Sequence, residues 1–276
     1  MRLAAPVPSP HDDPQEWVRA VKAKGYRAAY LPVEAGADRP EEFARAAAQA
    51  DIVIAEVGAW SNPLSADAEQ RSRARQLCCQ RLSLADRAGA RCCVNIAGSR
   101  GEKWDGPDPR DLTGETFEMI VDSVREIIDT VSPKRTFYTL ETMPWMYPDS
   151  PESYLELIRA IDRPRFAAHF DPVNLVSSPQ RYFRSGELIR DFCAKLGPHI
   201  RSCHAKDILL QNNLTTHLDE VRPGLGGLDY RTLMRELARL DADTPVCLEH
   251  LPNESEYDAA AAHVRLVASE VGAGPV

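Results

Sequence analysis

Four short segments of this chain end in side chains that can bind a divalent metal. Each segment is a strand-like run of aromatic, branched or small residues. The segments cover residues 135–141, 165–171, 200–207 and 244–250, and the side chains at or near their ends are Glu141, Asp171, His204 and Glu249. Core packing alone does not account for four such endings on successive strands, so their agreement predicts one common site.

Three carboxylates and one imidazole form a mixed set of metal ligands. Carboxylate oxygens suit Mg²⁺ and Mn²⁺, and an imidazole shifts the preference toward Mn²⁺, Co²⁺, Ni²⁺ or Zn²⁺. Three carboxylates placed together without a cation would repel one another at a considerable energetic cost. We therefore expect one bound divalent metal, and this ligand set leaves Mn²⁺, Mg²⁺, Co²⁺, Ni²⁺ and Zn²⁺ open.

Each of these residues taken alone also has an ordinary structural interpretation. A glutamate at a strand end is more often a helix cap or a surface ion-pair partner than a ligand. His169 is either a satisfied core histidine or a residue that supports the metal site or contacts the substrate. Lys206 either pairs with Asp207 or Glu249 or contacts the substrate at the rim.

Other polar and aromatic side chains lie at or just past the ends of earlier strand-like segments. Glu56, Trp60 and Asn95 could line the same mouth, although packing and capping are the favoured roles for them. Residues 97–109 include three glycines and Trp104. This segment is too long and too polar for a simple connector, so we expect it to cover a site.

Strand-like and helix-like segments alternate along the whole chain. A run of eight strand–helix units favours a closed parallel (β/α)8 barrel over an open sheet, and the lack of a linker predicts one α/β domain over residues 1–276. Residues 179–196 are expected to form one helix, and a polar loop is expected after residue 206. The predicted strands cover residues 2–7, 26–32, 51–57, 90–96, 135–141, 165–171, 200–206 and 244–249.

A barrel of this kind would bring the four candidate ligands to one mouth. Catalytic groups of such barrels lie at the C-terminal ends of the strands. Because side chains alternate along a strand, an inward His204 implies an inward Lys206. By the same alternation, an inward Glu249 implies that Cys247 points inward and that His250 points toward the helix layer.

Composition narrows the functional class. The 276 residues are 43% hydrophobic and 27% charged, which allows a large core, and the formal net charge of −8 argues against a nucleic-acid-binding surface. No apolar run approaches the ~18 residues of a membrane span, and the N-terminus does not resemble a signal peptide. The seven cysteines do not form a disulfide or zinc pattern, so we expect reduced thiols in a cytoplasmic protein.

From Leu140 onward the chain resembles the xylose isomerase-like (β/α)8 barrels. This family includes sugar phosphate isomerases and epimerases, ketose 3-epimerases, inosose dehydratases and endonuclease IV. The resemblance rests on the motifs LETMP, HFDPVN, CHAKD, PGLGGLDY and CLEHL, in this order and at this spacing. It implies that one divalent metal, often Mn²⁺, is bound by Glu141, Asp171, His204 and Glu249. It also implies that Glu141 and Glu249 act as the acid/base pair on opposite faces of the substrate carbon.

Two positions depart from the ketose epimerases of this family. Those enzymes usually carry a histidine three residues after the metal-binding aspartate and an arginine six residues after the metal-binding histidine, whereas this chain has Asn174 and Leu210. The additional histidines of the endonuclease branch are absent. The motif HFDPVN is more similar to the sugar isomerase-like branch that is related to the metal-binding subunits of C-glycoside deglycosidases.

These features predict proton abstraction next to a carbonyl of a sugar or keto-sugar, through a metal-stabilised enediolate. A metal-dependent isomerase or epimerase is the first hypothesis. A lyase, either a dehydratase or a C-glycoside deglycosidase-type enzyme acting on a 3-keto sugar, is the second, and a non-catalytic barrel subunit or ligand-binding protein is the third. A homo-oligomer and a hetero-oligomeric partner subunit both stay open. Contacts with the carbohydrate substrate are expected from His169, Asn174, Lys206, Glu56 and Trp104.

Overall fold

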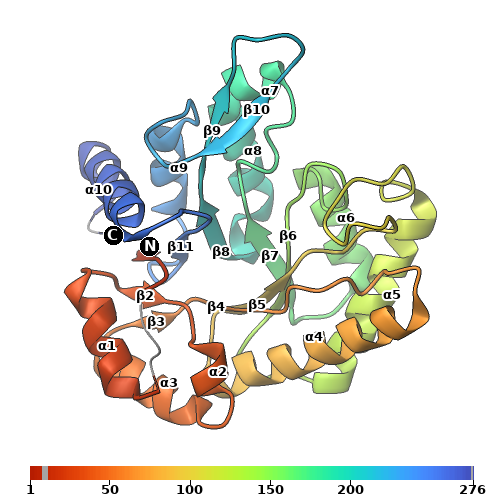
Figure 1. The fold of residues 1–276 in the computed structure, drawn as a ribbon, viewed down its shortest axis with the longest axis horizontal. Helices are drawn as coiled ribbons and strands as arrows, with labels where there is room; N and C mark the ends of the chain where they lie inside the picture. The colour runs from red at the N-terminus through yellow and green to blue at the C-terminus, as the bar shows by residue number, and fades with distance from the viewer. Residues whose placement is uncertain (8–11, 275) are drawn as a thin grey trace.

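Parallel strands surrounded by helices form the centre of the molecule (Figure 1). The computed structural model describes residues 1–7, 12–274 and 276. A seven-stranded parallel sheet has the order β1-β11-β8-β7-β6-β5-β4, and β2 pairs with β3 beside it. These strands are β1 (Arg2–Ala4), β2 (Ala28–Ala29), β3 (Val53–Ile54), β4 (Glu56–Gly58), β5 (Cys92–Asn95), β6 (Tyr138–Glu141), β7 (Phe166–Phe170), β8 (Ile200–Ala205) and β11 (Pro245–Leu248).

Backbone hydrogen bonds on both sides of the β2–β3 pair close the ring. The Arg27 N–H donates to the Leu3 carbonyl at 3.3 Å, and the Arg91 N–H donates to the Ile54 carbonyl at 3.0 Å. The segments β3 and β4 form one barrel strand that is interrupted at Ala55. Eight strand positions therefore surround a common axis, which confirms the predicted TIM barrel.

The helices begin where the sequence supplies capping side chains. Thr113 and Ser150 each accept a hydrogen bond from a first-turn N–H group, and Gly89 ends the longest helix in the left-handed conformation. The helices are α1 (Pro14–Ala23), α2 (Val33–Gly36), α3 (Pro40–Gln49), α4 (Ala68–Ala88), α5 (Gly114–Val131), α6 (Pro151–Ile161), α7 (Pro179–Phe183), α8 (Ser185–Leu196), the 3-10 turn η1 (Gly197–His199), α9 (Tyr230–Leu237) and α10 (Glu254–Glu270).

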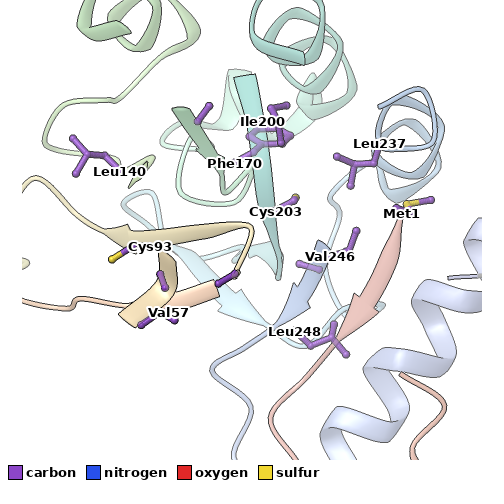
Figure 2. Close-up of a cluster of buried hydrophobic side chains, with 14 of the residues drawn as sticks. Met1, Val57, Cys93, Leu140, Phe170, Ile200, Cys203, Leu237, Val246 and Leu248 are labelled. Atoms are coloured by element: carbon purple, nitrogen blue, oxygen red, sulfur yellow. The ribbon is translucent and has the colours of Figure 1, made fainter. Parts of the chain in front are cut away.

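The main hydrophobic core lies between the strands and the helices. Figure 2 shows Leu140, Phe170, Cys203 and Leu248 among its buried side chains. Each is one position away from a candidate ligand in sequence, so strand alternation sends one residue into this core and the next toward the barrel axis. Inside the barrel, the side chains of Ala4, Ala28, Ala55 and Cys247 form a separate small cluster.

Two predicted elements were wrong. Residues 179–196 form two helices, because Arg184 leaves the helical region at φ −122° and ψ 27°. The break lets the Ser185 hydroxyl accept a hydrogen bond from the Asp229 N–H at 3.1 Å. The predicted polar loop after residue 206 contains an antiparallel hairpin of β9 (Asp207–Leu210) and β10 (Leu218–Val221), which extends away from the barrel (Figure 1).

The remaining predictions from composition concern membranes and cysteines. Within the part of the chain that the structure describes, no helix combines the length and apolarity needed to cross a membrane. All seven cysteines are free thiols, and six of them are buried. They therefore behave as small apolar residues of the packed interior.

Candidate active site at the mouth of the barrel

A cavity of about 740 Å³ opens at the C-terminal ends of the strands. Carboxylates and Lys206 form its floor, and aromatic side chains stand around its rim. The rim is supplied by Tyr30, Trp60, Trp104, Trp145 and Tyr257. This size is within the range of small-molecule sites, and the position is the one that enzymes with this fold use.

The structure brings the four candidate metal ligands together. Glu141 is the last residue of β6, Asp171 follows β7, His204 lies near the end of β8, and Glu249 follows β11. One ligand atom from each residue lies within 4.8 Å of the others. The four strand endings, which are far apart in the sequence, thus bring their side chains into one compact set of candidate metal ligands.

His204 is the centre of this cluster. Its Nδ1 atom lies 2.8 Å from Glu249 Oε1, 3.1 Å from Glu141 Oε1 and 3.9 Å from Asp171 Oδ2. Its Nε2 atom lies 3.1 Å from Glu56 Oε1. When a carboxylate accepts a hydrogen bond from Nε2, the other ring nitrogen, Nδ1, is the one left to bind a metal. Glu56 therefore orients the ring with Nδ1 toward the other carboxylates.

Within the four-residue ligand cluster, two buried carboxylate oxygens lack a hydrogen bond of good geometry from any described residue. They are Asp171 Oδ2 and Glu249 Oε1. The other oxygen of Asp171 accepts from the Val173 and Asn174 N–H groups at 2.9 and 3.1 Å, which fixes the carboxylate and leaves Oδ2 directed at the cluster. The contacts of these two oxygens are ion pairs with Lys206 and His204, and a bound cation would give these buried acceptors a direct ligand bond. The donor set therefore fits a divalent metal.

Lys206 places a positive charge beside the same oxygens. Its Nζ atom lies 2.8 Å from Asp171 Oδ2, 2.9 Å from Glu249 Oε1 and 3.4 Å from Glu220 Oε2, and the side chain is 3% exposed. Lys206 and His204 together offset the buried negative charge. The sequence left two alternatives for Lys206, an ion pair or a substrate contact at the rim. Lys206 forms ion pairs and also lines the pocket.

The shared field sets the protonation states of the cluster. Burial raises the pKa of Asp171 to about 7, and the negative charges of Glu141 and Glu249 act in the same direction. The positive charge of Lys206 acts to lower that pKa but is outweighed. Burial also acts to raise the pKa values of Glu141 and Glu249, but the positive charges of His204 and Lys206 lower both below the usual range. Both glutamates are therefore ionised at neutral pH.

The pKa values of the two cationic side chains, His204 and Lys206, are raised. Burial acts to lower the pKa of His204, but Glu249, Glu56 and Glu141 outweigh it and raise that pKa well above the usual value. The pKa of Lys206 is likewise raised by the surrounding carboxylates against the effect of burial. In the absence of metal, both side chains therefore carry a proton at neutral pH.

A second layer of polar residues lies beneath His204. Glu56 Oε2 accepts a hydrogen bond from the Ser202 hydroxyl at 2.8 Å and lies 3.2 Å from His169 Nε2. His169 is fully buried, and its ring centroid is 4.1 Å from that of His204. Glu56 borders the pocket floor with its oxygens already engaged, whereas His169 lies below the pocket lining.

The other predicted residues lie in several places. Asn174 lines the pocket and its Nδ2 donates to Glu141 Oε1 at 3.0 Å. Trp104 brings residues 97–109 to the rim, and Trp60 stands with its ring 6.4 Å from that of His204. Asn95 is buried and holds the Ser61 N–H at 3.1 Å, in the packing role favoured by the sequence.

His250 points in a direction that strand alternation did not predict. It lines the pocket instead of facing the helix layer, and its Nδ1 lies 3.0 Å from Glu220 Oε1. The reason is a backbone φ of 57°, which ends the extended conformation immediately after Glu249. Histidine is among the residues that tolerate this left-handed region.

Sequence reasoning missed several pocket residues. Glu220 reaches the pocket from β10, and no local pattern distinguishes it from other exposed acids of the hairpin. Trp145 follows the LETMP motif closely, which was an available signal. Its Nε1 donates to the Asp105 carbonyl at 2.9 Å, so the segment after β6 is joined to residues 97–109 across the mouth.

Two side chains outside the pocket hold its walls in place. The Tyr154 hydroxyl from α6 enters between β6 and β7, where it accepts from the N–H groups of Leu140 and His169 and donates toward the Leu140 and Ala167 carbonyls. The Asp207 carboxylate accepts from four backbone N–H groups at 2.8–3.0 Å, namely those of Ile208, Gly224, Gly226 and Leu228.

Comparison with known proteins agrees with the barrel fold. The family model described as xylose isomerase-like TIM barrel matches residues 18–267. No curated protein matches the chain.

Several solved structures share the fold at low sequence identity. The probable 3-DHS dehydratase from Bacillus anthracis involved in petrobactin synthesis has a TM-score of 0.71 and 17% identity, covering 97% of this chain and 98% of that one. A xylose isomerase-like TIM barrel protein from Mycobacterium smegmatis in complex with magnesium has a TM-score of 0.66 and 17% identity, covering 98% and 97%. The 3-keto-D-glucoside 4-epimerase from E. coli has a TM-score of 0.67 and 15% identity, covering 96% and 99%. The match of the family model over most of the chain shows that this protein belongs to the xylose isomerase-like TIM barrel family.

Proposed function

We propose that this protein is a divalent-metal-dependent sugar isomerase or epimerase that removes a proton next to a carbonyl group. The observation that carries the proposal is the convergence of Glu141, Asp171, His204 and Glu249 within 4.8 Å at the floor of the mouth cavity. These four side chains would hold the metal. When bound, a divalent cation supplies Lewis-acid polarisation of a carbonyl oxygen and stabilises negative charge that develops there.

Glu249 and Glu141 are the proposed base and acid. Both are ionised at neutral pH because His204 and Lys206 lower their pKa values, so either can accept a proton from carbon. They come from β6 and from the end of β11, which are separated in the sheet by β7 and β8. A substrate between them can lose its proton to one carboxylate and gain a solvent-derived proton through the other on the opposite face, which inverts the carbon, and the first glutamate then releases its proton to solvent.

Lys206 and Asn174 are proposed to hold the substrate oxygens. The Lys206 ammonium stays charged in the pocket, where it favours the negative charge of an enediolate. Asn174 already donates to Glu141 Oε1, so it can fix that carboxylate and still offer its amide to a hydroxyl. Trp104 borders the same space and offers an apolar surface for a sugar ring.

Glu56 and His169 are proposed to support the site from below. Glu56 holds His204 Nε2 and thereby keeps Nδ1 directed toward the metal ligands. His169 contacts Glu56 on the side away from the pocket. These contacts make both residues positioning residues in this proposal, in place of the substrate contacts expected from the sequence.

A lyase is the second candidate, favoured by the position of the Lys206 ammonium. Its Nζ atom lies 2.9 Å from Glu249 Oε1, so a base and a proton donor face the pocket side by side. Glu249 would remove the proton next to the carbonyl, and Lys206 would protonate the oxygen that leaves. This reaction needs the same metal site and differs only in the fate of the enediolate.

Deuterium exchange would test both reactions. The protein would be incubated in D₂O with Mg²⁺ and a panel of free ketohexoses, 3-keto glucosides and 3-DHS, and products would be analysed by mass spectrometry. We expect one deuterium in an isomeric product for an epimerase, or loss of water or an aglycone for a lyase. No incorporation and no elimination with the whole panel would contradict both and favour the non-catalytic barrel.

Conservative variants would assign the roles. Glu249→Gln and Glu141→Gln should each lower the exchange rate by about 10²- to 10⁴-fold, the usual contribution of a general base or acid. Glu187→Gln on α8, an exposed glutamate outside the pocket, is the matched control and should leave the rate unchanged. Equal rates in all three variants would show that neither proposed glutamate handles the proton.

A further inference from the structure

A second cavity lies on the opposite face of the barrel from the candidate active site. It has a volume of about 890 Å³ and is lined by residues at the starts of the strands. Arg91 immediately precedes β5, Phe137 immediately precedes β6, and Arg201 is the second residue of β8. The proposed reaction uses none of these residues.

Arginine side chains dominate this cavity even though the chain is acidic overall. Two of the lining arginines have acidic partners, because Arg91 lies 2.7 Å from Asp241 and Arg239 lies 2.8 Å from Glu236. The lining residues Arg135 and Arg201 have none. Across the described residues, neither guanidinium has a carboxylate oxygen within 4.0 Å, and both donate only to backbone carbonyls.

Phe137 holds two guanidinium groups at the edge of the cavity. The Cζ atom of Arg201 lies 4.2 Å from the centroid of its ring, and that of Arg165 lies 5.1 Å from it. Like Arg201, Arg165 is bonded to a backbone carbonyl and has no ion-pair partner among the described residues. The ring thus keeps two cations close to each other, where they repel, and reduces the mobility that they would have in solvent.

Two further features show that this positive charge is not fully offset. Burial lowers the pKa of the half-buried Arg201, and the charges of Arg91 and Arg165 lower it further, although Asp241 acts in the opposite direction. The Nε atom of Arg91 is buried at the cavity wall with no hydrogen-bond partner. An anion in the cavity would reduce the repulsion and accept hydrogen bonds from planar guanidinium groups, which suit phosphate oxygens in particular.

We propose that this cavity is a binding site for a phosphorylated small molecule. Arg135, Arg201 and Arg91 would bind the phosphate, and Phe137 would pack against the organic part of the ligand. The volume exceeds what one inorganic phosphate requires and falls in the range of sites for small organic ligands. The site is separate from the mouth cavity, so it does not depend on the proposed reaction.

Calorimetric titration of the full-length protein would test this site with three probes at fixed ionic strength: inorganic phosphate, pyrophosphate and AMP. We expect saturable binding of pyrophosphate or AMP to the wild type. Arg201→Ala and Arg135→Ala should each weaken that binding by about tenfold or more, as expected for loss of a charged hydrogen-bond donor. Arg135 is exposed, so its variant keeps the fold even if Arg201→Ala does not.

Two additional variants give the experiment its controls. Arg73→Ala on α4 removes an exposed arginine far from the cavity lining and should leave the affinities unchanged. Phe137→Leu should weaken AMP more than pyrophosphate, which would distinguish an organic phosphate from an inorganic one. The proposal is overturned if none of the three probes binds, or if Arg135→Ala binds as tightly as Arg73→Ala.

Discussion

The two ends of the barrel carry charge of opposite sign, and they differ in how far that charge is paired with neighbouring residues. At the mouth, buried carboxylates face the equally buried cations His204 and Lys206. On the opposite face, Arg135 is exposed and Arg201 is half-buried, and neither guanidinium has an acidic partner within 4.0 Å across the described chain. A single strand, β8, contributes to both ends, because Arg201 lies at its start and His204 near its end.

This difference separates a site in which the charged groups are all paired from a cavity in which two of the four lining arginines are paired with acids. At the mouth, each carboxylate lies close to a cation supplied by the chain, so the cluster is held in place before any ligand arrives. A metal must then compete with Lys206 and with the proton on His204. In the arginine cavity Arg91 and Arg239 are paired with acids, but Arg135 and Arg201 have no such competitor among the described residues, so an anion there would meet two unpaired guanidinium groups. Changes at the mouth should therefore have larger effects than changes at the other end.

The largest expected effect is the loss of metal from ligand variants. Asp171→Ala and His204→Ala each remove one donor and should abolish stoichiometric metal binding after dialysis, as measured by elemental analysis per chain. Asp219→Ala and His199→Ala remove the same residue types outside the mouth and serve as controls. Metal content equal to that of the wild type in both ligand variants would show that the cluster is not the metal site.

Removal of the internal cation comes next. Lys206→Met leaves Asp171 and Glu249 without the ammonium, and breaking a buried ion pair on one side costs about 3–5 kcal/mol of the free energy of unfolding. A divalent metal would compensate for that loss. We therefore expect a lower melting temperature without metal and a larger rise on adding Mg²⁺ than in the wild type. An equal rise in both proteins would show that Lys206 and the metal do not share these oxygens.

A smaller effect is expected from the residue below His204. Glu56→Gln keeps the shape of the side chain but weakens its hold on His204 Nε2, and such partners of metal ligands typically contribute 10- to 100-fold to metal affinity. Competition with a fluorescent chelator would measure the change. Glu220→Gln, which lies at the rim and contacts Lys206, should change the affinity less. If Glu220→Gln weakened metal binding more than Glu56→Gln, the hairpin residue would be the more important support of the metal site.

The dependence of metal affinity on pH follows from the charge state of the mouth. Without metal, the pKa of Asp171 is raised to about 7 and that of His204 is raised well above its usual value. Both groups must lose their protons to act as ligands, so metal affinity should rise with pH through the neutral range. At neutral pH, binding should release protons from both groups, which calorimetry in buffers of different ionisation enthalpy would measure. An affinity independent of pH would contradict this charge assignment.

The smallest effect is predicted across the barrel. Arg135→Ala should leave metal affinity at the mouth within about twofold of the wild type, because solvent and salt screen charges separated by more than ~10 Å. The same chelator competition would measure it. A large change would show that the two ends of the barrel are coupled.

Much of the barrel could be predicted from the sequence because its signals are local. The strand-like runs, the capping residues Thr113 and Ser150 and the regular alternation of elements identified the eight units. The candidate ligands were found because each lies at a strand end, and parallel strands bring their ends to one face. Alternation along β8 also placed Lys206 on the same side as His204.

The rest depends on features that local patterns do not carry. The hairpin was missed because its apolar residues 208–210 continue the preceding strand, while the turn and the two acidic residues of β10 resemble a polar loop. His250 was misplaced because a single left-handed residue reverses the expected direction. The contact of Glu56 with His169 and Ser202 depends on how β4 faces β7 and β8 across the barrel, and no spacing in the chain records that.

The hydroxyl of Tyr154 has a consequence for how this chain can exchange parts with its relatives. That single group from α6 supplies hydrogen bonds to the backbones of both β6 and β7. The stretch from residue 138 to residue 171 is therefore a unit that must be transferred whole. A chimaera with a crossover inside it would keep these hydrogen bonds only where the other parent also supplies a hydroxyl at this helix position, whereas crossovers on either side should preserve the fold.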